Sequence, residues 1–199
     1  MRLFAAVDLD SAARRVAAVI AEGMTRQLSQ GNSAHALRWV LPGQLHITLR
    51  FLGETSYEQV DSIRLALQLP WESEAFSVAF EGLNLFPLAG RPRVVCFGIN
   101  RGQDQLAALK AELDRRLGSV GLAPSGRPFL AHLTLGRIGR ELGGSGSDVR
   151  KLVSIYRPHS ARWLVDRFTL YESRLSHSGA SYYGLESIPL RLASGKRTT

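Results

Sequence analysis

Cysteine and lysine are scarce in this chain of 199 residues. Cys96 is the only cysteine, which excludes a disulfide within the chain and favours a reducing, cytoplasmic location. Lysine stands only at positions 110, 151 and 196, so arginine carries most of the net charge of +8. The planar guanidinium group suits phosphate, which makes nucleic acid or a nucleotide a reasonable partner. High-GC codon usage together with solubility explains the same charge equally well.

Long apolar runs are also missing. No run reaches eighteen apolar residues, so a transmembrane helix and membrane association are not expected. The first ten residues, "MRLFAAVDLD", are too short and too polar for a signal peptide and are expected to form a strand. With 45% hydrophobic and 21% charged residues, the composition is that of an ordinary globular domain.

The usual motifs of metal sites and of serine hydrolases are absent from the sequence. It has no His–x–His, no His–x–x–x–His and no cysteine pair, so a bound metal is not expected. It also has no G-x-S-x-G motif, which argues against a Ser–His–Asp hydrolase. No cofactor is expected.

The hydrophobic pattern alternates between strand and helix periods along the chain. It predicts strands over residues 2–8, 37–41, 45–51, 75–85, 93–99, 129–136, 162–174 and 182–191. It predicts helices beginning at Asp10 or Ser11, beginning at a Thr55–Glu58 capping box, over 103–118 and over about 148–156. The order strand–helix–strand–helix–strand therefore occurs twice.

This repeated order predicts an α+β fold with two similar lobes, largely antiparallel sheets facing a central cleft, and helices outside. Because no linker interrupts the chain, residues 1–192 are expected to form one domain. Its pseudo-symmetric halves would cover about 1–86 and 93–192, and residues 193–199 would be a frayed tail. A monomer is expected.

Two short strands carry the same His–x–Thr pattern, "LHITLR" at 45–50 and "HLTL" at 132–135. From composition alone, a chain of this length should contain about 0.2 such patterns. Both copies have an aliphatic residue between the two polar ones and leucine after the threonine. They also occupy equivalent places in the two halves, so two unrelated histidines on strands are a poor explanation.

The spacing of the motifs indicates a catalytic site. Side chains alternate along a strand, so His46 and Thr48 share one face, as do His132 and Thr134. Because imidazole titrates near neutral pH, one histidine can act as base while the other acts as acid. The threonine hydroxyls can donate hydrogen bonds to phosphoryl oxygens. An acid and a base on opposite sides of a phosphorus suit in-line displacement without a metal.

The sequence supports other candidate site residues less strongly. Arg50 lies on the face of His46 by alternation, although ordinary surface placement explains it equally well. The remaining histidines, His35, His159 and His177, stand in polar segments and are expected to be surface residues.

The two motifs and their surroundings resemble the two-histidine phosphoesterase superfamily, and within it the RNA 2′,3′-cyclic phosphodiesterases formerly called 2′-5′ RNA ligases. The resemblance covers nearly the whole chain. It includes "RLFAAVDLD" (2–10), "WVLPGQLHITLRFLGE" (39–54), "GRPRVVCFGI" (90–99), "RPFLAHLTLGR" (127–137) and "LYESRLSHSGASYYGLESIPL" (170–190). Two positions depart from the family pattern: Ala131 stands where proline is common, and Cys96 where an aromatic residue is common.

The resemblance implies hydrolysis of a terminal RNA or nucleotide 2′,3′-cyclic phosphate to a 2′-phosphomonoester. It implies His46 as proton donor and His132 as proton acceptor, an assignment that the nearly symmetric motifs alone do not give. It also implies a phosphate contact by Arg137, which requires the strand to end or bulge near Gly136 because strict alternation points Arg137 away. Two alternatives remain: 2′-5′ RNA ligation by the reverse reaction, and a non-catalytic module that binds RNA or nucleotides.

Overall fold

The computed structural model describes residues 1–29, 37–87, 90–124, 126, 128–139, 145–156, 160–176 and 179–192. The predicted tail at 193–199 lies outside these ranges. The strands are β1 (Arg2–Asp8), β2 (Leu37–Trp39), β3 (His46–Glu54), β4 (Phe76–Phe86), β5 (Val94–Arg101), β6 (His132–Ile138), β7 (Ala161–Val165), β8 (Arg167–Ser176) and β9 (Gly179–Pro189). The helices are α1 (Ser11–Ser29), α2 (Tyr57–Gln68), α3 (Gln103–Ser119), α4 (Ser145–Ile155) and the short 3₁₀ helix η2 (Pro42–Gln44).

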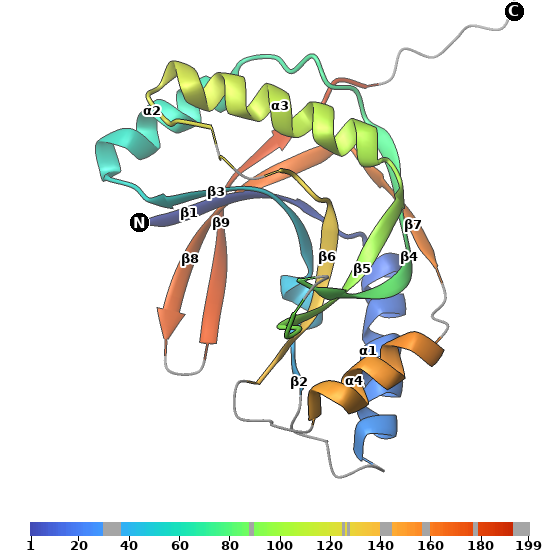
Figure 1. Ribbon diagram of the computed structural model, residues 1–199. Coiled ribbons are helices and arrows are strands. Elements are labelled where there is room, and N and C mark those ends of the chain that lie inside the picture. The colour runs from blue at the N-terminus through green and yellow to red at the C-terminus, as the bar shows by residue number, and fades with distance from the viewer. Residues whose placement is uncertain are drawn as a thin grey trace, which may run out of the picture.

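These strands form two sheets, and neighbouring strands in each are antiparallel. Sheet A has the order β3-β1-β8-β9, and sheet B has the order β2-β6-β5-β4-β7. Helices α2 and α3 pack together on the side of sheet A, and α1 and α4 pack together on the side of sheet B (Figure 1). The predicted α+β fold with antiparallel sheets and outer helices is confirmed.

Each half of the chain contributes strands to both sheets. Strand β4 follows β3 in the chain but pairs with β5 in sheet B, and β8 pairs with β1 in sheet A. Helix α1 likewise contacts β7 of sheet B, whereas α3 contacts β3 of sheet A. The halves 1–86 and 93–192 are therefore interleaved, and neither sheet is built from one half alone. Buried residues from strands of both sheets belong to one hydrophobic core.

Helix ends follow local sequence signals. Ala13 N–H donates a hydrogen bond to Asp10 Oδ1 at 2.7 Å, so Asp10 caps α1 as predicted. The capping box of α2 is formed by Ser56 and Gln59, one residue later than the predicted Thr55–Glu58 pair. Among the helices described, none is long and apolar enough to span a membrane.

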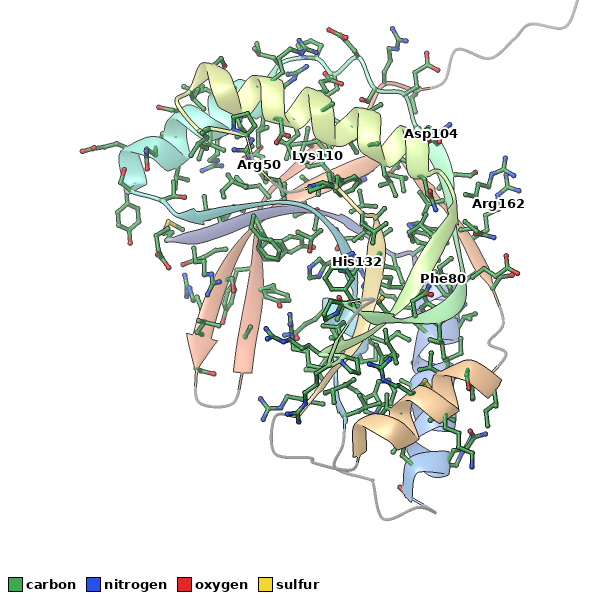
Figure 2. All side chains as sticks on the ribbon, viewed as in Figure 1. Arg50, Phe80, Asp104, Lys110, His132 and Arg162 are labelled. Carbon is green, nitrogen blue, oxygen red and sulfur yellow. The ribbon has the colours of Figure 1, made fainter. Side chains whose placement is uncertain are left out.

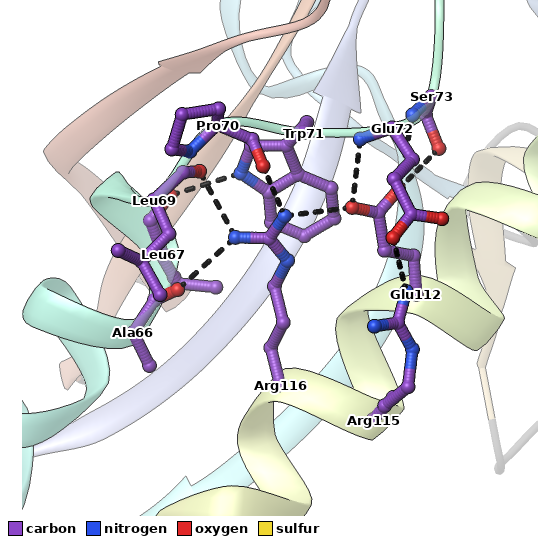
Figure 3. Close-up of polar contacts among 10 residues, drawn as sticks. All are labelled: Ala66, Leu67, Leu69, Pro70, Trp71, Glu72, Ser73, Glu112, Arg115 and Arg116. Carbon is purple, nitrogen blue, oxygen red and sulfur yellow. Dashed lines mark hydrogen bonds and ion pairs between the residues drawn. The ribbon is translucent and has the colours of Figure 1, made fainter.

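A buried polar network fastens α2 to α3 (Figure 3). The Glu112 carboxylate accepts hydrogen bonds from the backbone N–H groups of Glu72 and Ser73 and pairs with Arg116 at 2.8 Å. Arg116 also donates to the carbonyl groups of the chain leaving α2 and lies over the Trp71 ring at 4.1 Å. These contacts fix the segment after α2, and with it the start of β4.

Candidate active site

The two motif strands meet although they belong to different sheets. His46 opens β3 and His132 opens β6. Residues of the two strands approach within 8 Å between Cα atoms, which brings the motif-bearing faces of sheets A and B together. Figure 2 shows His132 between the two sheets. His46, Thr48, His132 and Thr134 are all half-buried, so they are within reach of a ligand.

Both imidazole rings are held in the same way. His46 Nδ1 bonds to the Gln44 carbonyl oxygen at 2.7 Å, and His132 Nδ1 bonds to the Leu130 carbonyl oxygen at 2.8 Å. A carbonyl only accepts, so each Nδ1 carries the proton and each Nε2 is the nitrogen that gains or loses one. The two imidazoles are thus oriented by the same kind of backbone contact.

The threonines share the faces of the histidines, as alternation predicted. Thr48 Oγ1 lies 3.1 Å from His46 Nε2, close enough for its hydroxyl to donate to the neutral ring. Thr134 lies two residues beyond His132 on β6 and has the same intermediate exposure. Each motif therefore offers one imidazole nitrogen and one hydroxyl to the same small region.

Neighbouring charges and burial set the protonation of His46. Burial is the largest influence and lowers the pKa of His46 below its ordinary value of 6.5. The Gln44 carbonyl and the Asp8 carboxylate raise this pKa, while the positive charges of Arg137 and His132 lower it. The charges of Arg137 and His132 on β6 thus reach His46 on β3, as expected for groups on neighbouring strands of the two sheets.

Asp8 lies directly opposite His46 in the β1–β3 register, and it is not among the site residues that the sequence predicted. Its carboxylate accepts hydrogen bonds from Thr169 Oγ1 at 2.9 Å and from the Tyr171 hydroxyl at 2.7 Å. Burial and the bond to Asp8 raise the pKa of Tyr171 to about 12. Asp8 is consequently a fixed negative charge beside the motif of β3. Antiparallel pairing of the first strand with the first motif was the signal that could have revealed it.

Matching β-bulges follow the two motifs. On β1, consecutive residues Ala5 and Ala6 pair with Arg50 and Thr48, so Leu49 is the extra residue of β3. On β5, consecutive residues pair with Gly136 and Thr134, so Leu135 is the extra residue of β6. A bulge shifts the alternation by one residue, so the side chains beyond each motif exchange faces.

The bulge in β3 overturns the expectation that Arg50 faces the substrate. Its side chain is buried and pairs with Asp114 at 2.7 Å. It also donates to the carbonyl oxygens of Leu122 and Ala123. Strict alternation failed because Leu49 and Arg50 both point into the interior. Arg50 therefore ties β3 to α3 and to the chain that follows α3.

The bulge in β6 has the opposite consequence for Arg137. The irregularity near Gly136 that a phosphate contact by Arg137 requires is present, and it places Arg137 back on the face of His132 and Thr134. Arg137 is exposed, and its charge influences His46 on the other sheet. An added Cβ at Gly136 would lie 3.1 Å from the Trp39 ring of β2, so a larger residue there would require Trp39 to shift.

Aromatic rings flank both histidines. The His46 ring lies 5.0 Å from Phe4 and 5.4 Å from Tyr182, between ring centroids. The His132 ring is stacked with Phe86, which belongs to β4, at 5.8 Å. These contacts restrain the imidazoles that the backbone carbonyls already orient.

Two further features bear on the chemistry of the site. In the part of the chain that the structure describes, no three His, Cys, Asp or Glu side chains gather as a metal site would require. An apolar cavity of about 450 Å³ lies between α1 and the β2–η2 segment, and its lining includes Leu45 and Leu135. Those residues alternate with the motif residues, so the cavity lies behind the motifs. His35, His159 and His177 fall outside the described residues.

Comparison with known proteins gives this arrangement a family. The model of the LigT-like phosphoesterases matches twice, over residues 13–96 and 98–182. The chain belongs to this family. The predicted membership of the two-histidine phosphoesterase superfamily is thus confirmed, and the double match divides the chain close to the predicted boundary between its halves.

Relatives in the family share most of the chain. A protein of Archaeoglobus fulgidus named RNA 2′,3′-cyclic phosphodiesterase is 33% identical over 93% of this chain and 98% of its own. A Thermus thermophilus protein of the same name is 31% identical over 98% of this chain and 93% of its own. Among solved structures, TT0787 of Thermus thermophilus has a TM-score of 0.72 at 27% identity, covering 98% of this chain and all of its own. E. coli LigT complexed with 3′-AMP has a TM-score of 0.67 at 28% identity, covering 95% and 97%.

Proposed function

We propose that this LigT-like phosphoesterase hydrolyses a terminal RNA 2′,3′-cyclic phosphate to a 2′-phosphomonoester by metal-independent acid–base catalysis. The observation that carries the proposal is the pair of similarly held imidazoles, each with Nδ1 bonded to a backbone carbonyl, which leaves Nε2 as the nitrogen that can exchange a proton; His46 Nε2 also contacts Thr48 Oγ1 at 3.1 Å. Binding alone does not need two such groups. The names of the relatives support the same reaction.

In the proposed step, His132 Nε2 removes a proton from water as the water oxygen attacks phosphorus. The bond from phosphorus to the 3′ oxygen breaks, and His46 Nε2 gives that oxygen its proton. The products are a 2′-phosphomonoester and a 3′-hydroxyl group, and the two histidines have exchanged protonation states. General acid–base catalysis of this kind contributes about a hundredfold to ten-thousandfold to a rate.

The remaining residues of the site stabilise charge. The hydroxyls of Thr48 and Thr134 are proposed to donate to the non-bridging oxygens of the phosphate, whose charge rises during attack. Arg137 is proposed to pair with the same phosphate from the face of β6. A bound anion would also favour protonated His46 and so oppose the effect of burial on its pKa.

Asp8 supports the assignment of His46 as the acid. Its carboxylate lies in register with His46 and favours the protonated ring. An acid must begin the cycle with its proton, whereas a base must begin without one. Without ligand, burial outweighs Asp8 and leaves the pKa of His46 lowered, so the assignment of His46 as the acid rests on the family resemblance and on the charge of a bound phosphate.

The test is incubation of the protein with nucleoside 2′,3′-cyclic phosphates and with a short RNA ending in one, with and without EDTA. The expected product is the 2′-phosphate isomer, formed at the same rate in EDTA. Loss of activity in EDTA that a divalent ion restores would refute the metal-free mechanism. Tight binding without any product would leave the non-catalytic binding module as the function, and joined RNA ends would favour ligation.

A further inference from the structure

A second arginine lies beside Arg137 on the motif face of sheet B. Arg38 of β2 is directly opposite Arg137 of β6 in the antiparallel register. Residues in such positions have Cα atoms about 4.5–5.5 Å apart and side chains on the same face. The neighbours of Arg38 confirm its direction, because Leu37 is buried in the core and Trp39 packs against Gly136.

Nothing in the described part of the chain neutralises this pair. Both arginines are exposed, and neither guanidinium has a carboxylate within ion-pair distance among the residues that the structure describes. By contrast, Arg64, Arg167 and Arg191 are exposed arginines that each pair with a carboxylate. Like charges directly opposite each other on a sheet are unfavourable, so an anionic ligand would relieve the repulsion.

The position of β2 shows where such a ligand would extend. Strand β2 is the edge of sheet B, next to β6, so no further strand of the sheet lies beyond Arg38. Arg137 lies two residues of β5 away from the level of Thr134, which is roughly 7 Å along the sheet at about 3.3 Å per residue. A ligand that starts at the motifs and passes Arg137 therefore reaches Arg38 before it leaves the sheet.

We infer that Arg38 binds the next phosphate of the substrate, the 5′-phosphate of the nucleotide whose cyclic phosphate lies at the two histidines. This inference rests on the proposed function and narrows its substrate class. The preferred substrate is an RNA end or a 5′-phosphorylated nucleotide, and a nucleoside cyclic phosphate without a 5′-phosphate is a poorer one. The guanidinium fork is suited to this contact because it can give two parallel hydrogen bonds to phosphate oxygens.

The inference is tested with two substrates that differ by one phosphate. Adenosine 2′,3′-cyclic phosphate and its 5′-phosphorylated form are compared by kcat/KM. The wild-type protein is expected to prefer the 5′-phosphorylated form, and Arg38→Gln is expected to lower that preference about tenfold, as loss of one charge-assisted contact would. The change should fall mainly on KM, because the contact is remote from the reacting bond.

Arg15→Gln is the matched control, since it removes the same charge from an exposed position on α1. Arg15→Gln is expected to leave the preference for the 5′-phosphorylated substrate unchanged. If it lowered this preference as much as Arg38→Gln does, the effect would come from the net charge of the protein and the inference would be overturned. A preference that survives Arg38→Gln would overturn the inference and leave Arg38 as a charge that keeps the edge strand from pairing with other chains.

The wild-type protein gives an independent measurement. Its preference for the 5′-phosphorylated substrate should shrink as salt rises, because salt screens exposed charges. Equal use of both substrates at low salt would overturn the inference without any variant. Failure to hydrolyse either substrate would instead refute the proposed function itself, so the two failures are distinguishable.

Discussion

At the scale of single residues, the chemistry depends on which nitrogen of each histidine is available. Backbone carbonyls two residues before His46 and His132 bind Nδ1, so Nε2 is the atom that the proposed mechanism uses for proton transfer, and in His46 this atom also contacts Thr48 Oγ1. This equivalence explains why the motifs look interchangeable in the sequence. Asp8 makes them different, since it acts on His46 from the neighbouring strand.

Removal of either histidine should abolish most of the activity. His46→Ala and His132→Ala are each expected to lower kcat/KM by about a hundredfold or more, since each removes one proton-transfer step. The double variant should be little worse than either single one, because the pair works as a unit. Thr48→Val and Thr134→Val should cost less. Steady-state kinetics on a nucleoside 2′,3′-cyclic phosphate measures all five variants.

A substrate with a very good leaving group separates the two roles. Such a leaving group needs no proton, so His46→Ala should be rescued by this substrate and His132→Ala should not. Rescue of His132→Ala alone would reverse the assignment. Full activity in both variants on the natural type of substrate would remove the histidines from the mechanism.

Neutralising Asp8 should change the pH dependence more than the maximum rate. The Asp8 charge raises the pKa of His46, so Asp8→Asn should lower that pKa further. His46 would then lose its proton at lower pH, and the alkaline side of the bell-shaped profile of kcat/KM should move to lower pH. A pH–rate profile of Asp8→Asn beside the wild type checks this. A shift confined to the acidic side would mean that Asp8 acts on the base.

At the scale of secondary-structure elements, paired bulges and two buried ion pairs hold the site together. The bulge in β3 turns Arg50 inward to Asp114 on α3, and the bulge in β6 turns Arg137 outward. The same kind of bulge thus buries Arg50 in an ion pair on sheet A and leaves Arg137 exposed on sheet B. The Glu112–Arg116 pair fixes α2 against α3 and so fixes the path into β4.

Glu112→Gln should destabilise the protein in a pH-dependent way. Hydrogen bonds from the chain at 72–73 and from Arg116 outweigh burial and lower the pKa of Glu112 below its ordinary 4.5. Its charge therefore contributes stability above about pH 4.5, and this contribution is lost as the pH falls through the lowered pKa. The expected loss at pH 7 is roughly 2–4 kcal/mol, since one partner of a buried pair is removed.

Urea unfolding at pH 7 and at successively lower pH measures this loss. The difference between wild type and Glu112→Gln should shrink as the medium becomes acidic. Glu22→Gln, at an exposed position of α1, serves as the control and should be nearly neutral. A difference that stays constant with pH would show that packing, and not charge, is what the substitution removes.

At the scale of the whole molecule, the fold brings together two strands that are 86 residues apart in the chain. The chain passes from sheet A to sheet B between β3 and β4, and it returns to sheet A between β7 and β8. The two halves of the chain therefore cannot separate without breaking both sheets. Both halves of the chain therefore contribute strands to the sheets on each side of the site. The charge of the molecule, +8, is concentrated in arginine and attracts anionic ligands.

RNA binding should weaken only modestly as salt rises. Arg137 and Arg38 are proposed to contact phosphate, and each contact to single-stranded nucleic acid contributes about −0.7 to the slope of log affinity against log salt. The expected slope lies roughly between −1 and −2. Fluorescence anisotropy with a labelled RNA ending in a 2′-phosphate measures it. A much steeper slope would indicate a long RNA track over the surface.

The sequence by itself determined the elements and the chemical groups of the site. Hydrophobic periodicity predicted the strands, the helices and the α+β class, because burial imposes a period on each kind of element. The repeated His–x–Thr spacing predicted that His46, Thr48, His132 and Thr134 would share faces, because side chains alternate along any strand. These inferences needed only neighbours in the chain.

Tertiary structure alone decided how those elements are combined. Whether Arg50 or Arg137 faces the site depends on a bulge, which the pairing with β1 or β5 reveals and the spacing of residues does not. Asp8 and Arg38 lie beside the motif residues only because their strands pair with β3 and β6 in this register. The pairing of β8 with β1 likewise joins segments that are far apart in the chain. Sequence patterns record burial within one element, whereas register and crossing depend on contacts between segments far apart in the chain.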